Sequence, residues 1–303
     1  MDIDPNDPID LVGTHQLALR RIAQALTARI DTAFIFCFGL QCHESRYTHC
    51  FAQHTSKRWF KADILLVCDD SEQRCLYDIQ HLANNLNTDE QQYTAVVLQD
   101  RDAMQRLAAG DAFVCEVFRH GALLYSKAIA LPVRQGFVCH ATLLQKTREG
   151  WRRWFNNSCQ FMDCAIYCLV ERNFNMAVFM VHQTVEQACK AMLKVMLYLR
   201  PNTHNLAWML KLCSSLAPEI ATVFPRDNPQ DKALFNLLKN SYTHSRYAAG
   251  FVVKEEEAWT LYYRASALLR IAGDLSNRRI AELEALVNTP PAIRPVATQP
   301  DSP

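Results

Sequence analysis

The second half of the chain carries apolar residues at helical spacing over long stretches. Between residues 174 and 199 they recur every three or four positions, at Val178, Val181, Val185, Ala188, Met192, Val195 and Leu199. Residues 258–275 repeat this pattern with Ala258, Leu261, Ala265, Leu268, Ala272 and Leu275. A third long helix is predicted over 141–171, and shorter ones over 204–216 and 230–247, on either side of a proline-marked loop. Long amphipathic helices with short connections predict an antiparallel bundle.

The first half alternates helical patterns with short apolar runs that are typical of buried strands. Strands are predicted over 32–39, 62–68 and 93–99, with a long loop between the first two. Helices are predicted over 15–30, 72–86 and 101–110, and residues 112–126 fit a helix followed by a strand. This alternation predicts a small α/β domain, so the fold class of the whole chain is α+β and mostly helical.

Charge supports a division of the chain into two domains. Residues 1–136 carry 13 basic and 17 acidic residues, a net charge of −4, and residues 137–303 carry 19 and 14, a net of +5. The total of +1 excludes a globally basic nucleic-acid binder, and the 8 glycines among 303 residues favour helices. Pro132 and Gly136 mark a linker. We therefore predict domains at 1–132 and 137–287, followed by a disordered proline-rich tail at 288–303.

The 12 cysteines indicate a reducing compartment. None of them forms a CxxC pair, and Cys37 and Cys68 lie inside apolar runs, as free buried thiols do. The N-terminus is acidic and no stretch is long and apolar enough for a transmembrane helix. We expect a cytoplasmic protein.

The helix predicted at 174–199 also has a polar stripe. Gln183, Glu186, Lys190 and Lys194 follow one another at helical spacing, with His182 beside them. The ordinary interpretation is a solvated face with one Glu186–Lys190 ion pair, worth a few tenths of a kcal/mol.

Three segments of this half resemble the HEPN domain family. They read AVFMVHQTVEQACKAMLK, THNLAWMLKLC and LLKNSYTHSRYAAGF, in the order in which the family has them. The matching residues are His182, Gln183, Glu186, Lys190, Thr203, His204, Asn205, Leu206, Tyr242, Arg246 and Tyr247. The resemblance covers roughly 140–287. It implies a bundle of four to five helices that is usually dimeric and often coupled to nucleotides or RNA.

The resemblance also implies a candidate ligand site. Lys190, Lys194, His204 and Arg246 would converge on a groove for phosphate, and Tyr242 or Tyr247 would stack on a base. The full candidate set is His182, Glu186, Lys190, Lys194, His204, Tyr242, Arg246 and Tyr247. The structural alternative is that Thr203 caps a helix and His204 packs against the bundle.

The ribonuclease members of this family have an arginine followed four to six residues later by a histidine. Here YAAGFVV follows Arg246, and His244 precedes it, so that pattern is absent. This departure argues against ribonuclease activity.

The first half resembles a minimal nucleotidyltransferase domain with a degenerate site. That family has a strand ending in Gly-Ser and a following strand with Asp-x-Asp, whose carboxylates hold Mg²⁺. Gly39 stands at the end of the first strand but Leu40 follows it, and Lys61 replaces the first carboxylate, which leaves Asp63. Asp100 could supply a further carboxylate. The resemblance therefore implies a domain that has lost its metal site.

A cluster of cysteines and histidines lies in the segment between the first two strands. Cys42, His43, His49, Cys50 and His54 are all zinc-ligand types, although their spacing matches no common zinc module. The alternative is a polar surface insertion.

Three functions follow from these observations. The favoured one is a non-catalytic module that binds a nucleotide or a phosphorylated small ligand, acts as a homodimer formed through the bundle, and works through a protein partner. The second is a nucleotidyltransferase or ribonuclease of the toxin–antitoxin type, and the damaged motifs argue against it. The third is an antitoxin-like scaffold without a ligand. No cofactor other than a nucleotide is expected.

Overall fold

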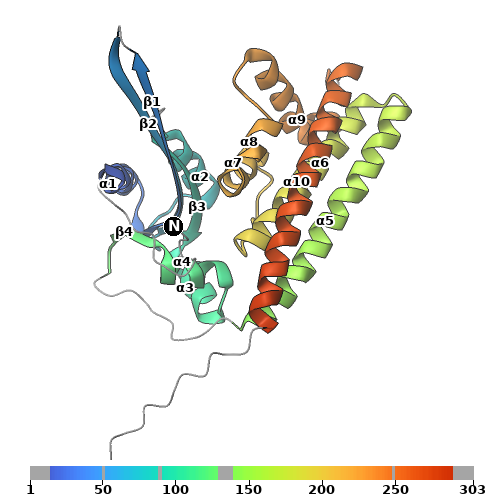
Figure 1. Cartoon of the computed structure of the whole chain (residues 1–303). Coiled ribbons are helices and arrows are strands. Elements are labelled where there is room, and N and C mark those ends of the chain that lie inside the picture. The colour runs from blue at the N-terminus through green and yellow to red at the C-terminus, as the bar shows by residue number, and fades with distance from the viewer. Residues whose placement is uncertain (1–13, 50–51, 88–90, 129–138, 248–249, 289–303) are drawn as a thin grey trace, which may run out of the picture.

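The computed structural model describes residues 14–49, 52–87, 91–128, 139–247 and 250–288. Within these ranges the side chains of 14–15, 43–59, 91 and 246–247 are not described. A mixed sheet with its helices forms the first part of the chain, which we call the sheet part, and helices alone form the second, the helical part (Figure 1). The α+β, mostly helical fold class is confirmed.

The sheet has four strands in the order β3-β2-β1-β4. They are β1 (Thr32–His49), β2 (Ala52–Cys68), β3 (Gln91–Gln99) and β4 (Ala122–Ser126). β1 is antiparallel to β2 and β4, and β2 is parallel to β3. The far ends of β1 and β2 pair only with each other and extend as a two-stranded ribbon (Figure 1). The long loop predicted here was wrong, because a polar ribbon held by backbone hydrogen bonds leaves no apolar pattern in the sequence.

Helices cover both faces of the sheet. Helix α1 (Thr14–Thr27) and α2 (Leu76–Asn85) share a core with Ile64 and Leu66 of β2. On the opposite face, α3 (Asp100–Ala109) and α4 (Ala112–His120) pack with Leu65 and Val67. Burial on both faces explains why the strand sequence ADILLVC is continuously apolar rather than alternating.

The helical part is built around α6. Its helices are α5 (His140–Val170), α6 (Phe174–Met196), α7 (Leu206–Leu216), α8 (Glu219–Val223), α9 (Pro229–Tyr247) and α10 (Glu255–Asn288). Residues 171–173 join α5 to α6 in a tight turn, with Arg172 at a φ of 56°. The predicted apolar stripe of α6 is buried, and α5, α7, α9 and α10 all contact this helix. The antiparallel bundle was predicted, whereas the short α8 and the extension of α10 to Asn288 were not.

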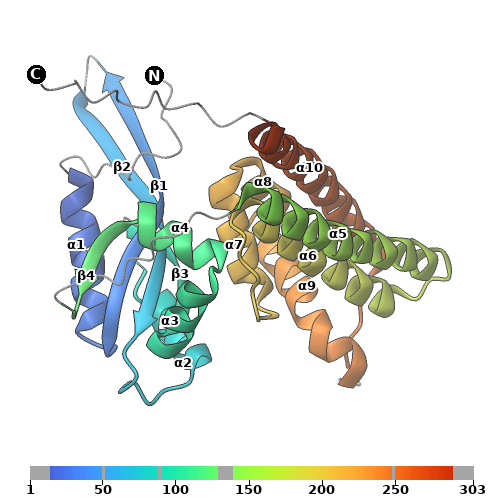
Figure 2. The same cartoon turned by 90° about the horizontal axis from the view of Figure 1, so that it is seen from below.

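Helix α7 lies between the sheet and the rest of the bundle (Figures 1 and 2). The indole Nε1 of Trp208 donates to the backbone oxygen of Ala95 in β3 at 2.8 Å. The ammonium of Lys211 donates to the backbone oxygen of Tyr93 in the same strand at 2.8 Å. One hydrophobic core runs from a face of the sheet into the bundle. The two parts are therefore packed together through α7.

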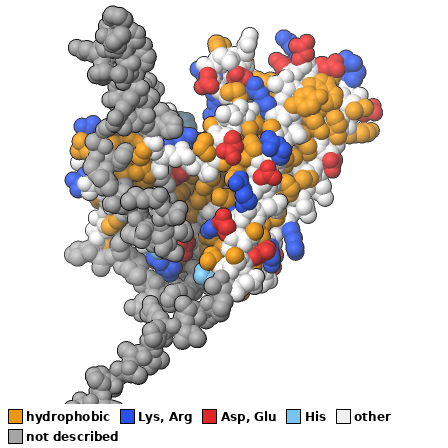
Figure 3. Space-filling view, viewed as in Figure 1, with side chains coloured by type: hydrophobic (Ala, Val, Ile, Leu, Met, Phe, Trp, Pro, Cys, Tyr) orange, Lys and Arg blue, Asp and Glu red, His pale blue; other side chains and the backbone are white. Residues whose placement is uncertain are grey.

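The visible surface of the helical part mixes acidic and basic side chains, and hydrophobic side chains gather at its end away from the sheet (Figure 3). The free thiols of Cys37 and Cys68 are buried, as predicted. Among the helices in the described ranges, none is long and apolar enough to cross a membrane.

Candidate functional site

The polar stripe of α6 is centred on a buried carboxylate, Glu186. Its side chain is 1% exposed, and Lys190 Nζ donates to its Oε1 at 2.7 Å. His204, in the segment that leads into α7, places Nδ1 3.1 Å from both carboxylate oxygens. The solvated face expected from the ordinary interpretation was wrong, because Lys190 is only 9% exposed and its ion pair lies inside the bundle.

His182 completes the surroundings of the carboxylate from one turn earlier on α6. Its Nδ1 is 3.0 Å from the backbone oxygen of Leu238 in α9, which can only accept, so Nδ1 carries a proton. Its Nε2 faces Glu186 Oε2 at 3.6 Å, longer than an ordinary hydrogen bond but close enough for the two groups to interact electrostatically.

These neighbours keep Glu186 ionised. Burial by itself would raise the pKa of the carboxyl, but His182, Lys190 and His204 together outweigh it and lower the pKa to about 2. A buried negative charge therefore persists at neutral pH, and it fixes the orientation of the His204 ring.

His204 is the exposed member of the cluster. Its side chain is 60% exposed, and its ring stacks on Tyr242 of α9 with centroids 5.1 Å apart and planes inclined by 20°. The Tyr242 ring also lies near those of His182, at 5.4 Å, and Phe179, at 6.4 Å between centroids. Lys190 Nζ lies 5.5 Å from the ring centroid of Trp154 in α5. The structure thus brings together five of the predicted residues: His182, Glu186, Lys190, His204 and Tyr242.

The remaining predicted residues of this site lie elsewhere or outside the described side chains. Lys194 packs against Gly150 of α5, and burial lowers the pKa of its ammonium, which has Asp111, Lys146 and Arg200 as electrostatic neighbours. The side chains of Arg246 and Tyr247 are outside the described residues.

The helix start after His204 differs from the expectation. Asn205 caps α7 by accepting from the Trp208 amide at 3.1 Å. Thr203 instead accepts from the Asn205 amide at 3.1 Å. The helix begins at Leu206, so the cap falls two residues after the predicted one.

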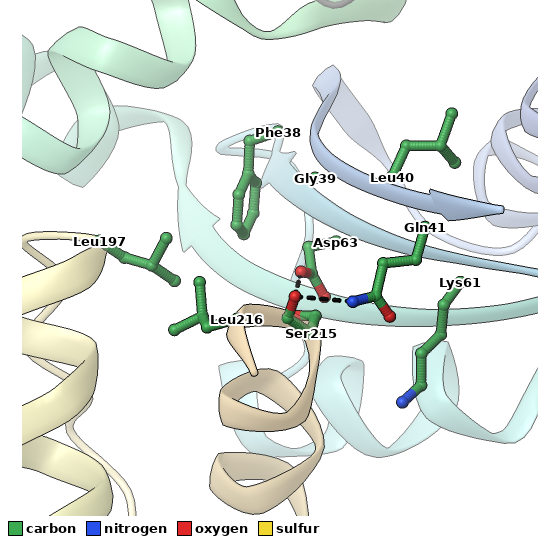
Figure 4. A pocket seen from close by; sticks show the side chains of 9 residues that line it. All are labelled: Phe38, Gly39, Leu40, Gln41, Lys61, Asp63, Leu197, Ser215 and Leu216. Carbon is green, nitrogen blue, oxygen red and sulfur yellow. Dashed lines mark hydrogen bonds between the residues drawn. The ribbon is translucent and has the colours of Figure 1, made fainter. Parts of the chain in front are cut away.

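The two residues that the sequence assigned to a degenerate nucleotidyltransferase site, Gly39 and Asp63, also meet. Gly39 of β1 pairs with Asp63 of β2, and a Cβ placed on Gly39 would lie 2.9 Å from Asp63 Oδ2. The hydroxyl of Ser215, at the end of α7, donates to the Asp63 carboxylate. Gln41 Nε2 donates to the backbone oxygen of Ser215 at 2.9 Å. These two contacts hold the end of α7 over this site (Figure 4).

Asp63 is poorly suited to hold a metal. Burial raises the pKa of its carboxyl to about 7, although Ser215, Lys61, Lys211 and Thr94 act in the opposite direction. Lys61, two residues earlier, would repel a cation. Asp63 pairs with Thr94 and Cys68 with Gln99, which puts Gln99 roughly 16 Å further along the sheet and Asp100 beyond it. Asp100 therefore does not join Asp63 as a second carboxylate.

The predicted zinc ligands fall mostly outside the described side chains. Cys42 is exposed near the base of the ribbon. His43, His49, Cys50 and His54 are in the part whose side chains are not described.

Lys211, Ser214 and Ser215 were missed as site residues. The sequence predicted only that they belong to a helix. They are polar residues within the otherwise apolar sequence LAWMLKLCSSL, and this interruption indicates that one face of the helix has polar partners.

Comparisons with known proteins concern mainly the helical part. The chain is similar to a nucleotidyltransferase-like protein from Exiguobacterium sibiricum, with 10% identity, 91% of this chain and 81% of that chain covered, and a TM-score of 0.30. No curated protein matches it. The family model of the HEPN domain matches residues 151–275, which run from α5 into α10 and include Glu186, His204 and Tyr242. The helical part of this protein therefore contains a HEPN domain.

Proposed function

We propose that this HEPN domain protein binds a nucleotide or another phosphorylated small ligand without transforming it. The observation that carries the proposal is the exposed His204 ring, which a buried carboxylate orients and Tyr242 supports from one side. An aromatic platform held in place before binding loses little entropy when a base stacks on it.

Lys190 can supply the contact to phosphate. An ammonium has three donors, and Glu186 takes one of them at 2.7 Å. Lys190 lies beside Trp154 and is paired with Glu186, the carboxylate that also contacts His204. A cation and an aromatic platform therefore lie in one region. These are the two groups by which proteins commonly hold nucleotides.

The surroundings of Asp63 support a non-catalytic role. Two-metal transfer of a nucleotidyl group requires several ionised carboxylates around the ions. Here one buried carboxyl has a pKa near 7, bonds to Ser215 and lies beside Lys61. We propose that any nucleotide is bound rather than consumed.

Calorimetric titration of ATP, GTP, AMP and a short RNA, with and without Mg²⁺, tests the proposal. We expect saturable binding that His204→Ala and Tyr242→Leu each weaken at least about tenfold, through loss of stacking. His81→Ala, which removes an exposed histidine from α2, is the matched control and should bind as the wild type does.

The other functions predict different results in the same titration. Binding that requires Mg²⁺ would favour a nucleotidyltransferase, and cleavage of the RNA would favour a ribonuclease. Absence of binding to every ligand would contradict the proposal and favour the antitoxin-like scaffold.

We also propose that the bundle forms a homodimer through the end away from the sheet. Tyr167, Val170, Val252 and Tyr263 are between 64% and 76% exposed. The turn between α5 and α6 meets the start of α10 there through the Arg172–Glu255 ion pair at 2.8 Å. Light scattering should show that Tyr263→Glu lowers the mass to that of a monomer, whereas Tyr77→Glu on α2 leaves it unchanged. A wild-type monomer would refute this.

The domain limits remain a proposal as well. We propose that residues 1–132 and 137–287 are the two domains and 288–303 a tail. Limited proteolysis should cut between the first two and within the tail, and a first cut inside α7 or β2 would contradict the division.

A further inference from the structure

Lys61 and Lys211 lie close together where the sheet meets α7, and Arg226, in the segment after α8, is an electrostatic neighbour of both. Lys61 of β2 donates from Nζ to Ser214 Oγ at 3.1 Å, and Ser214 Oγ donates to the Lys211 backbone oxygen at 2.8 Å. The Lys61 ammonium thus lies within one turn of Lys211 on α7. Arg226 is exposed and stacks with its Cζ 4.0 Å above the Phe235 ring.

These cations exceed the negative charge around them. Lys61 and Arg226 repel the ammonium of Lys211, and burial together with this repulsion lowers its pKa to about 8. Among the described groups that act on Lys61 and Lys211, Asp63 is the one carboxylate, and Ser215 already donates to it.

An imbalance of this kind favours an anion. Bringing like charges together in a partly buried place costs free energy, which an oxyanion bridging them would offset. Lys and Arg donate charge-assisted hydrogen bonds to phosphate oxygens. A pocket of about 100 Å³ adjoins Lys61 (Figure 4). Its polar lining residues are Gln41, Lys61, Asp63 and Ser215, and they lie beside Phe38, Gly39, Leu40, Leu197 and Leu216.

We propose that Lys61, Lys211 and Arg226 bind an oxyanion of the phosphate class at the junction between the sheet and α7. In the nucleotidyltransferases that the sheet part resembles, position 61 would be a carboxylate that binds a metal cation. Here it is a lysine, so the site favours an anion instead of a cation. This site is separate from the His204–Tyr242 platform and does not depend on it.

Titration of inorganic pyrophosphate into the full chain at low salt tests the site. We expect Lys61→Gln and Arg226→Gln each to weaken binding about tenfold, since each removes one charge-assisted contact. Asp63→Asn removes the opposing carboxylate while keeping an acceptor for Ser215, so it should tighten binding. Lys239→Gln, which removes an exposed charge from α9, controls for net charge.

Opposite effects at the neighbouring positions 61 and 63 distinguish this site from general attraction of anions. Unchanged affinity in Lys61→Gln and Arg226→Gln, with circular dichroism showing both folded, would overturn the proposal, as would an equal loss in Lys239→Gln. His204→Ala should bind pyrophosphate normally, so this site and the nucleotide platform can fail independently. Competition by ATP would indicate a phosphate carried by a ligand, and binding of pyrophosphate alone would indicate a free anion.

Discussion

Glu186 should be the most sensitive polar position of the bundle. Glu186→Gln removes the negative charge but keeps the size of the side chain, which leaves Lys190, 9% exposed, without its counterion. Breaking a buried pair in this way costs about 3–5 kcal/mol. We therefore expect the free energy of unfolding at pH 7 to fall by about that amount. Urea unfolding followed by tryptophan fluorescence measures it, with Trp154 as a reporter close to Lys190.

The pH dependence gives an independent magnitude. The folded state lowers the pKa of Glu186 from 4.5 to about 2, so its stabilisation is present above pH 4.5 and is lost as the pH falls toward 2. That shift corresponds to an upper limit of about 3 kcal/mol. The wild type should lose this contribution between these pH values, and Glu186→Gln should lack this part of the pH dependence.

An exposed pair of the same spacing provides the control. Asp102 and Arg106 of α3 are also four residues apart and 2.9 Å apart, but their side chains are 42% and 37% exposed. Asp102→Asn should cost less than about 1 kcal/mol. If Glu186→Gln were no more destabilising than Asp102→Asn, burial would not explain the importance of this ion pair. In the double variant Glu186→Gln/Lys190→Met, part of the loss should be recovered, because no unpaired buried charge remains.

Three further changes test the junction around Asp63 and α7. Asp63→Asn should stabilise the protein above pH 7 by up to about 4 kcal/mol and should have no such effect near pH 4. The reason is that folding raises the pKa of the Asp63 carboxyl to about 7, so its ionisation opposes folding as the pH rises. Urea titrations at both pH values measure the difference. Trp208→Phe should cost about 1–3 kcal/mol in the same assay by leaving the Ala95 oxygen without its donor. Gly39→Ala should cost about 1–3 kcal/mol, and less in an Asp63→Ala background, because the added Cβ meets the Asp63 carboxylate.

The sequence predicted the elements whose burial follows a regular period. The stripe on α6 is an example: Val178, Val181 and Val185 recur at helical spacing and are all 0% exposed. The continuous apolar run of β2 likewise indicated a strand covered on both faces. Periodicity succeeds in these places because burial itself repeats with the geometry of the element.

The partners of each buried face could not be predicted in the same way. Glu186 and Lys190 have the spacing of a surface ion pair, and only the packing of α5 and α9 around α6 makes the pair internal. The resemblance to HEPN domains predicted that His204 shares a groove with Lys190, but its contact with Glu186, 18 residues earlier in the chain, follows from neither spacing nor composition. Contacts of this length depend on the tertiary structure, which a single sequence does not encode in any local pattern.

The unusual residues at position 61 and at the end of α7 explain each other. With α7 seated on the sheet, Asp63 is buried and needs a donor, which the Ser215 hydroxyl supplies. A second carboxylate at position 61 would add a like charge beside Asp63 in a partly buried site. Lys61 instead brings a cation and donates to Ser214. The cation at position 61 and the docking of α7 thus fit one arrangement, because the Ser214 and Ser215 hydroxyls at the end of α7 contact the Lys61 ammonium and the Asp63 carboxylate.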